Sequence, residues 1–201
     1  VVSVVHDTIY LFPVKEMKKL SIIKPFQIQI PIANIVDMCF IEQSSSHIIQ
    51  IAVIGDLNIK CDRTYEKKRY MFVYSIEEEI FNISFKYKIE LPRDAHKLLP
   101  INKHRPTAIL AFSFNGITRI FIDENAEPTT DFFTCNVDFV TFLICSYTDD
   151  IFFLYGASGE VQIANLAPDE NPYIEKILQT DVVSSIIKID AETLVITTTR
   201  G

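Results

Sequence analysis

A repeated unit of two apolar segments and a glycine is the feature that most limits how this chain can fold. In each copy an apolar segment, a polar turn and a second apolar segment lead to a glycine, at Gly55, Gly116, Gly159 and Gly201. Glycine suits a tight turn after a strand because a positive φ costs it little. The last two intervals are 43 and 42 residues (116 to 159 and 159 to 201), and the first is 61 because of an insertion near residues 56–68. We expect two further strands after each of the first three copies, and four strands per repeat of this length are typical of a β-propeller blade.

The composition also favours strands over helices. The chain contains 15 Phe and 8 Tyr, and its apolar segments are short and separated by polar turns rather than spaced with a helical period. The predicted strands are residues 1–5, 8–14, 26–30, 34–41, 47–54, 69–76, 80–89, 97–101, 107–114, 117–122, 138–145, 151–155, 160–166, 173–178, 183–189 and 193–198. Residues 15–22 are the best helical candidate, and that segment is too short to be stable alone.

The sequence therefore predicts an all-β fold, a β-propeller of four-stranded blades, with about four to five blades of a seven-bladed ring present. We assign the whole chain to part of a single propeller domain: a partial blade at 1–31, blades at about 32–94, 95–137 and 138–182, and a partial blade at 183–201. Because neither end closes a ring, we expect these residues to come from a larger propeller protein. Expressed alone, they are expected to aggregate or stay partly unfolded.

The charge and hydropathy of the chain limit its partners. Nineteen Lys plus Arg against 26 Asp plus Glu give a net charge of −7, which disfavours general binding to a phosphate backbone. No apolar run approaches the roughly 18 residues that a membrane-spanning helix needs. We therefore expect protein partners, with no direct nucleic-acid binding and no membrane contact from this segment.

The cysteines and histidines do not follow a metal-binding pattern. The four cysteines are scattered without a CxxC pair: Cys39, Cys61, Cys135 and Cys145. We expect buried free thiols in a reducing compartment. The four histidines lie at predicted strand edges or turns without HxH or HExxH spacing: His6, His47, His96 and His104. Hydrogen-bonded or solvated imidazoles are favoured over ligands, so we predict no metal and no cofactor.

The sequence also lacks a recognisable catalytic motif. Acidic pairs at 123–124, 149–150 and 169–170 flank predicted strands, where carboxylates commonly cap the backbone N–H groups of turns. The chain has no GxSxG, P-loop or GxGxxG motif, only five glycines, and no tryptophan that could serve as a sugar platform. We therefore expect a protein that is not an enzyme, and a hydrolase-type propeller is the weaker alternative.

One basic segment departs from the acidic average. The insertion near residues 56–69 carries five cations: Lys60, Arg63, Lys67, Lys68 and Arg69. It is predicted to protrude as a solvated loop, and the alternative is a loop that docks a partner or contacts phosphate. Most phenylalanines are expected in the core, so exposed loop tyrosines are the better anchors for a partner. The candidate partner-binding residues are Tyr65, Lys67, Lys68, Arg69, Tyr147 and Tyr173.

Several runs, in their order along the chain, resemble segments of a known family. Residues 7–14 (DTIYLFPV) are similar to an aspartate-led strand, 26–30 (FQIQI) to the strand after it, and 34–40 (NIVDMCF) to the segment that opens the next blade. Residues 151–166 (IFFLYGASGEVQIANL) resemble two strands joined through a small turn and Gly. Residues 194–201 (LVITTTRG) resemble a strand that ends in a Ser-Arg-Leu-Gly turn, with Thr199 in place of Ser and Gly201 one position early.

That family comprises large triple-propeller scaffold proteins: the large subunits of the UV-damaged-DNA-binding protein and of the cleavage and polyadenylation specificity factor, and splicing factor 3b subunit three. The short link between residues 14 and 26 is more similar to the DNA-damage-binding branch. The resemblance implies the first propeller of a nuclear adaptor subunit of a cullin–RING E3 ubiquitin ligase, acting in the DNA damage response or replication-fork repair.

In that branch, the resemblance implies, the first and third propellers hold substrate-receptor subunits and the second docks the cullin. The alternative within the family is a scaffold subunit of mRNA 3′-end processing or of splicing. The resemblance assigns no binding residue in this chain.

Overall fold

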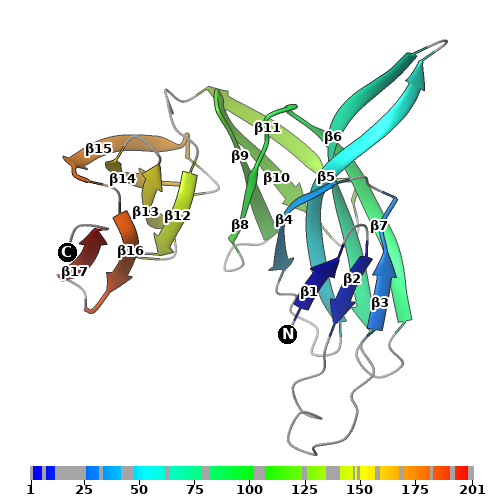
Figure 1. Cartoon of the computed structure of the whole chain (residues 1–201), viewed down its shortest axis with the longest axis horizontal. Helices are drawn as coiled ribbons and strands as arrows, with labels where there is room; N and C mark the ends of the chain where they lie inside the picture. The colour runs from blue at the N-terminus through cyan, green and yellow to red at the C-terminus, as the bar shows by residue number, and fades with distance from the viewer. Residues whose placement is uncertain are drawn as a thin grey trace, which may run out of the picture. The chain divides into compact units, whose positions relative to one another are not determined.

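The computed structural model describes residues 2–5, 8–11, 26–31, 34–41, 48–61, 64–77, 82–101, 107–123, 126–134, 141–146, 148, 150–156, 159–167, 170–181, 183–190 and 193–198 (Figure 1). These residues form strands and short connections, and none of them is in a helix. The all-β prediction is therefore confirmed. The helical candidate at 15–22 lies outside the described residues.

Short strands with alternating or continuous apolar positions account for the architecture. The strands of the described residues are β1 (Val2–Val5), β2 (Thr8–Leu11), β3 (Phe26–Gln29), β4 (Asn34–Ile41), β5 (Ile48–Cys61), β6 (Thr64–Glu77), β7 (Asn82–Leu91), β8 (Lys97–Ile101), β9 (Thr107–Ser113), β10 (Gly116–Ile122), β11 (Thr129–Thr134), β12 (Thr141–Ser146), β13 (Ile151–Gly156), β14 (Glu160–Asn165), β15 (Tyr173–Gln179), β16 (Val183–Lys188) and β17 (Leu194–Thr198).

Within each sheet every strand pairs antiparallel with the next one along the chain. Three sheets have four strands, in the orders β4-β5-β6-β7, β8-β9-β10-β11 and β12-β13-β14-β15, while β1-β2-β3 and β16-β17 form smaller sheets. The four-stranded sheets lie within the ranges 32–94, 95–137 and 138–182 that the sequence assigns to blades. Consecutive four-stranded antiparallel sheets of this kind are compatible with a partial β-propeller.

The chain divides into two compact units, Val1–Arg93 and Asp94–Gly201. In the first unit, the β1-β2-β3 sheet packs face to face on the β4–β7 sheet. Ile9 and Ile28 from the smaller sheet share one apolar cluster with Ile51, Val53 and further residues of β5 and β6. The core of this unit is therefore the layer between two sheets.

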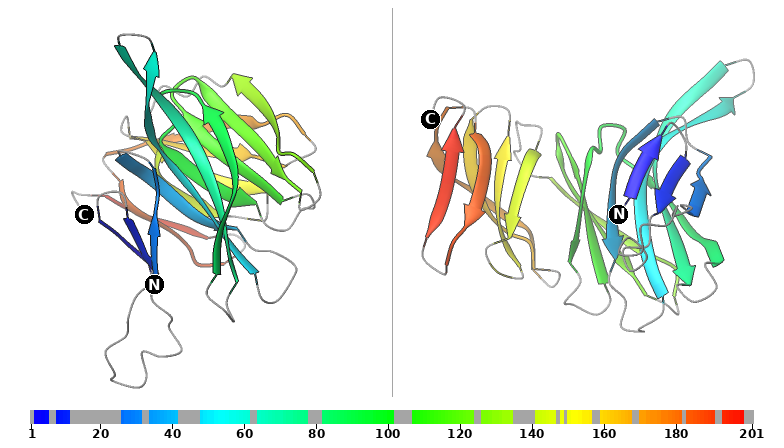
Figure 2. Two further views of the ribbon diagram at one scale, coloured as in Figure 1. Left: turned by 90° about the vertical axis from the view of Figure 1, so that its right-hand side faces the viewer. Right: turned by 60° about the horizontal axis from the view of Figure 1, so that its bottom comes forward.

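The second unit stacks three sheets. Leu110 and Phe112 of β9 share a cluster with Phe152 and Leu154 of β13, so the first two sheets of this unit face one another. The neighbouring Tyr155 points to the opposite face, where it clusters with residues of β16 and β17. Strand β16 also lies in contact with β12, the first strand of the preceding sheet, and Figure 2 shows β16 beside its partner β17. Because side chains alternate between faces, one strand serves two interfaces.

Two polar contacts reinforce this stack. The Arg119 guanidinium on β10 is buried and donates from Nη1 to the carbonyl oxygens of Ala167 and Glu170, at 3.1 and 2.8 Å. These two acceptors lie in the connection between β14 and β15, so the arginine joins adjacent sheets. On the other face, the hydroxyl of Tyr155 accepts the backbone N–H of Val183 at 2.8 Å.

The structure corrects two details of the prediction. Residues 129–134, which the sequence did not predict as a strand, form β11, and most of its side chains are exposed. Gly55 does not lie in a turn: it pairs with Tyr70 inside the β5–β6 ladder. Gly159 does have the positive φ predicted, at 79°. Gly201 lies outside the described residues.

Candidate protein-docking site

The predicted basic loop is a long two-stranded hairpin. Strands β5 and β6 pair continuously from Ile48↔Glu77 to Cys61↔Thr64. Strand β4 pairs with β5 only as far as Asp56, and β7 pairs with β6 only as far as Arg69. Among the described strands, residues 57–61 and 64–68 therefore pair only with each other, and we call them the free ribbon. Figure 1 shows it extending beyond the ends of β4 and β7, so the predicted protrusion is present but the predicted loop is wrong.

Alternation of side chains explains why the free ribbon is a pair of strands. Leu57 and Ile59 are partly buried and pack against the apolar cluster of the first unit. The side chains on the other face of the ribbon are exposed: Asn58, Lys60, Tyr65 and Lys67. Asn58 pairs with Lys67 and Lys60 with Tyr65, and paired residues share a face of the ladder. We call these four residues the basic face of the ribbon.

A buried carboxylate fixes the base of the ribbon. Asp56 is 1% exposed, and its Oδ1 accepts from Arg69 Nε at 2.7 Å. Its Oδ2 lies 2.8 Å from Lys67 Nζ and accepts a longer hydrogen bond from Asn34 Nδ2 at 3.4 Å. The carboxylate thus joins three strands at the point where β4 and β7 end. A buried charge is tolerated only when it is paired and hydrogen-bonded in this way.

The pKa of Asp56 reflects a balance between burial and these partners. Burial raises the pKa, but the hydrogen bonds from Lys67 and Arg69, together with the charge of Arg69, outweigh it, so the pKa lies below its usual value. Asp56 is therefore ionised near neutral pH. Its charge is matched by the cations of β6.

A second ionic contact lies on the opposite face of the hairpin. Lys68 Nζ lies 3.1 Å from Glu90 Oε1 on β7, and the hydroxyl of Tyr70 donates to the other oxygen of Glu90 at 3.5 Å. Hydrogen bonding to Glu90 raises the pKa of Lys68. Burial is the main cause that raises the pKa of Tyr70, and the charge of Glu90 adds to it. The ammonium of Lys88 lies 5.0 Å from the centre of the Tyr70 ring. Ionic contacts therefore stabilise the base of the ribbon on both faces.

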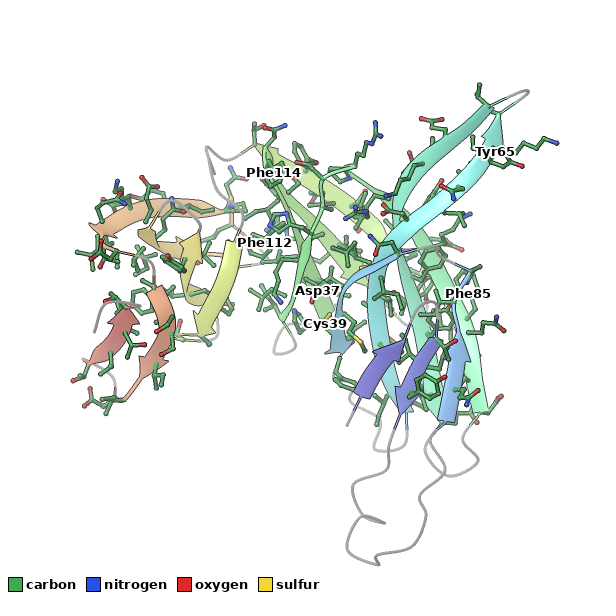
Figure 3. All side chains as sticks on the ribbon, in the orientation of Figure 1. Asp37, Cys39, Tyr65, Phe85, Phe112 and Phe114 are labelled. Carbon is green, nitrogen blue, oxygen red and sulfur yellow. The ribbon has the colours of Figure 1, made fainter. Side chains whose placement is uncertain are left out.

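The structure brings together four of the six predicted partner-binding residues, but three of them already have intramolecular partners. Lys67 and Arg69 pair with Asp56, and Lys68 pairs with Glu90. Tyr65 is 73% exposed, and Figure 3 shows it on the ribbon. The remaining two are separate: Tyr147 lies outside the described residues, and Tyr173 is 58% exposed on β15 in the second unit, where its hydroxyl donates to Glu175 at 2.9 Å.

The sequence interpretation missed Asp56 and Glu90. A signal was present, because apolar and polar residues alternate from Leu57 to Lys60, which is typical of a strand rather than a loop. The pair Gly55-Asp56 looks like the start of a turn and concealed it. The partners of Asp56 lie 11, 13 and 22 positions away, so no local pattern indicates its burial.

The cysteine and histidine predictions have mixed outcomes. Cys39 is partly buried, whereas Cys61 is exposed at the end of the ribbon, so its predicted burial is wrong. Neither thiol forms a disulfide, and the Sγ of Cys61 lies 3.8 Å from Glu66 Oε2. His96 is partly buried, and its Nδ1 is 3.1 Å from the carbonyl oxygen of Asp94. The other histidines and Cys135 lie outside the described residues, as does the side chain of Cys145.

Within the described ranges, no three His, Cys, Asp or Glu side chains gather as a metal site would require. No described helix could cross a membrane. The ionic pairs at the base of the ribbon have a structural role, because they hold neighbouring strands together. The basic face of the ribbon carries Tyr65 together with Lys60 and Lys67. That combination suits the binding of another protein surface.

No protein-family model matches the chain, and none of the curated proteins matches it.

Proposed function

We propose that this protein is a non-catalytic interaction scaffold that docks a partner protein on its free ribbon. The observation that carries the proposal is the exposure of Tyr65, at 73%, on a hairpin whose base is fixed by the buried Asp56. Large aromatic side chains contribute most of the binding energy in many interfaces. A ribbon held in place before binding loses less conformational entropy than a mobile loop would.

The absence of a catalytic motif in the sequence supports a non-catalytic role. Stacked four-stranded sheets also support it, because such a framework presents variable loops and hairpins on a rigid body. The described stacks place their apolar residues between sheets, and the hairpin extends outside that core.

The family resemblance supports a more specific proposal. We propose that the scaffold is a nuclear adaptor subunit of a cullin–RING E3 ubiquitin ligase that acts in the DNA damage response or replication-fork repair. Its partners would be a cullin and substrate-receptor subunits. The same family contains scaffolds of mRNA 3′-end processing and splicing, which the experiment below distinguishes by the subunits retained.

The test is affinity purification of the full-length protein from its own cells, followed by mass spectrometry of the retained proteins. Cullin, RING and receptor subunits would support the ligase proposal, whereas polyadenylation or splicing subunits would replace it with the RNA-processing role. If no partner is retained at moderate salt, the scaffold proposal is wrong.

The ribbon is tested in the same experiment by Tyr65→Ala. The matched control is Phe132→Ala, which removes another exposed aromatic side chain, on β11 of the second unit. We expect a directly bound partner to be lost with Tyr65→Ala and kept with the control. A partner retained by both variants would place the docking site elsewhere.

A further inference from the structure

On the side of β6 that faces away from β5, the outer residues of the strand have no partner strand among the described residues. Strand β7 pairs with β6 from Glu77 to Arg69, and no described strand continues along residues 64–68. In an antiparallel strand, alternate residues direct their backbone N–H and C=O groups to each side. Residues 64–68 therefore present hydrogen-bonding groups that a further strand can use.

The side chains along this edge indicate the charge of that strand. Lys60 and Lys67 lie on the basic face with Tyr65, and half of the Lys67 side chain is exposed although it pairs with Asp56. An ammonium group donates three hydrogen bonds, so Lys67 can contact a second carboxylate. The remainder of the chain is acidic, with a net charge of −7, so the ribbon is a local positive site on a negative molecule.

Edge protection is the competing explanation, because natural sheets often place lysine on free edges to prevent association. Tyr65 argues against it. A protected edge favours charge, and Glu66, Lys67 and Lys68 fit that explanation, but the aromatic ring of Tyr65 is 73% exposed beside them and does not. An aromatic side chain next to unpaired backbone groups is typical of a binding edge.

We propose that residues 64–68 of β6 bind an acidic, extended peptide segment of a partner protein, which adds to the sheet as a strand. The added strand continues the line of β7 beyond Arg69. Its carboxylates lie on the basic face, near Lys67 and, across β6, near Lys60, and the methylene groups of these acidic side chains pack on Tyr65; its other side chains lie on the opposite face. This inference rests on the proposed docking function and specifies the chemistry of the partner.

The test uses a short synthetic peptide that alternates valine and glutamate, with a peptide that alternates valine and lysine as the control. Both have the same strand propensity and opposite charge. Backbone amide exchange is measured for the protein with each peptide. We expect the glutamate peptide to slow exchange at residues 64–68, the lysine peptide to have no effect there, and binding of the glutamate peptide to weaken as salt is added.

Two variants test the named side chains. Lys60→Glu and Tyr65→Ala are each expected to raise the dissociation constant of the glutamate peptide at least about fivefold, which corresponds to about 1 kcal/mol. Both residues are exposed, so circular dichroism should show unchanged folding. Phe132→Ala removes an exposed aromatic side chain from β11 of the second unit; it is the control and should bind as the parent protein does.

Protection away from residues 64–68, equal binding of both peptides, or no protection at all would each overturn the acidic-strand proposal. Its failure is distinguishable from failure of the docking function. If a cellular partner is lost with Tyr65→Ala while the glutamate peptide does not bind, the ribbon docks a partner of another chemistry.

Discussion

Replacing Asp56 by Asn tests whether a buried charge holds the base of the ribbon. The substitution preserves the shape of the side chain and removes its charge. Arg69, whose side chain is 12% exposed, then loses its buried anion, whereas Lys67, whose side chain is 49% exposed, can recover hydration. The loss of stability should therefore come mainly from Arg69, which is left buried without its anion.

The magnitude follows from the geometry. At 2.7 Å and an effective dielectric constant of about 20, the attraction between Asp56 and Arg69 is about 6 kcal/mol before desolvation is subtracted. Removing one member of a buried pair generally costs about 3–5 kcal/mol. The asparagine oxygen can still accept a hydrogen bond from Arg69, so we expect the free energy of unfolding to fall by about 3 kcal/mol, at the low end of that range.

The assay is urea denaturation of the parent and variant proteins, followed by circular dichroism. Asp131→Asn is the matched control, because this carboxylate is 56% exposed and lies 3.7 Å from Arg119. Its loss should cost under about 1 kcal/mol. If Asp56→Asn costs no more than the control, the buried carboxylate does not stabilise the hairpin.

The same variant should change the response to acid. The pKa of Asp56 is lower in the folded state than its ordinary value of 3.8, so the unfolded state binds the proton first as the pH falls. The stability that Asp56 contributes is fully present above that ordinary value and is lost as the pH drops through the folded-state pKa. The difference in unfolding free energy between parent and Asp56→Asn should therefore shrink below about pH 4, and a difference that grows there would contradict the assignment.

Three further substitutions test the stack of the second unit. Gly159→Ala places a Cβ 2.3 Å from the carbonyl oxygen of Thr180 at a φ of 79°, so urea denaturation should show a loss of at least about 1–2 kcal/mol. Tyr155→Phe leaves the Val183 amide without its acceptor, which should cost about 1–3 kcal/mol and speed exchange of that amide; unchanged exchange would contradict the contact. Arg119→Met removes two donated hydrogen bonds in a buried site and should cost about 2–3 kcal/mol, whereas a neutral effect would show that the arginine does not join the sheets.

The sheets were predictable because their signals are local. In β5, β9 and β13, continuous apolar segments are flanked by polar turns, and such segments form strands buried on both faces. Strand β11 gave no such signal. Four of its first five residues are exposed, so its sequence TTDFFT carries little alternation and its strand is formed by pairing with β10.

The candidate site was predictable only in part. Charge and aromatic content identified the segment that protrudes, with Tyr65 exposed on it. The pairing of Lys67 and Arg69 with Asp56 depends on the ladder register, which places residues 13 positions apart on facing strands. Register is a property of the folded sheet, so a single sequence does not reveal which cations already pair with a carboxylate.

Within the free ribbon and its base, the residues needed for stability are different from those available for binding. The base of the ribbon depends on a carboxylate, an arginine and two apolar residues that pack on the core, because changing any of them is expected to lower the free energy of unfolding. Its outer residues, such as Lys60 and Tyr65, contribute little to that core. New partners can therefore be acquired by substitutions at the end of the hairpin while the stacked sheets stay the same, so that recognition can evolve at little cost in stability.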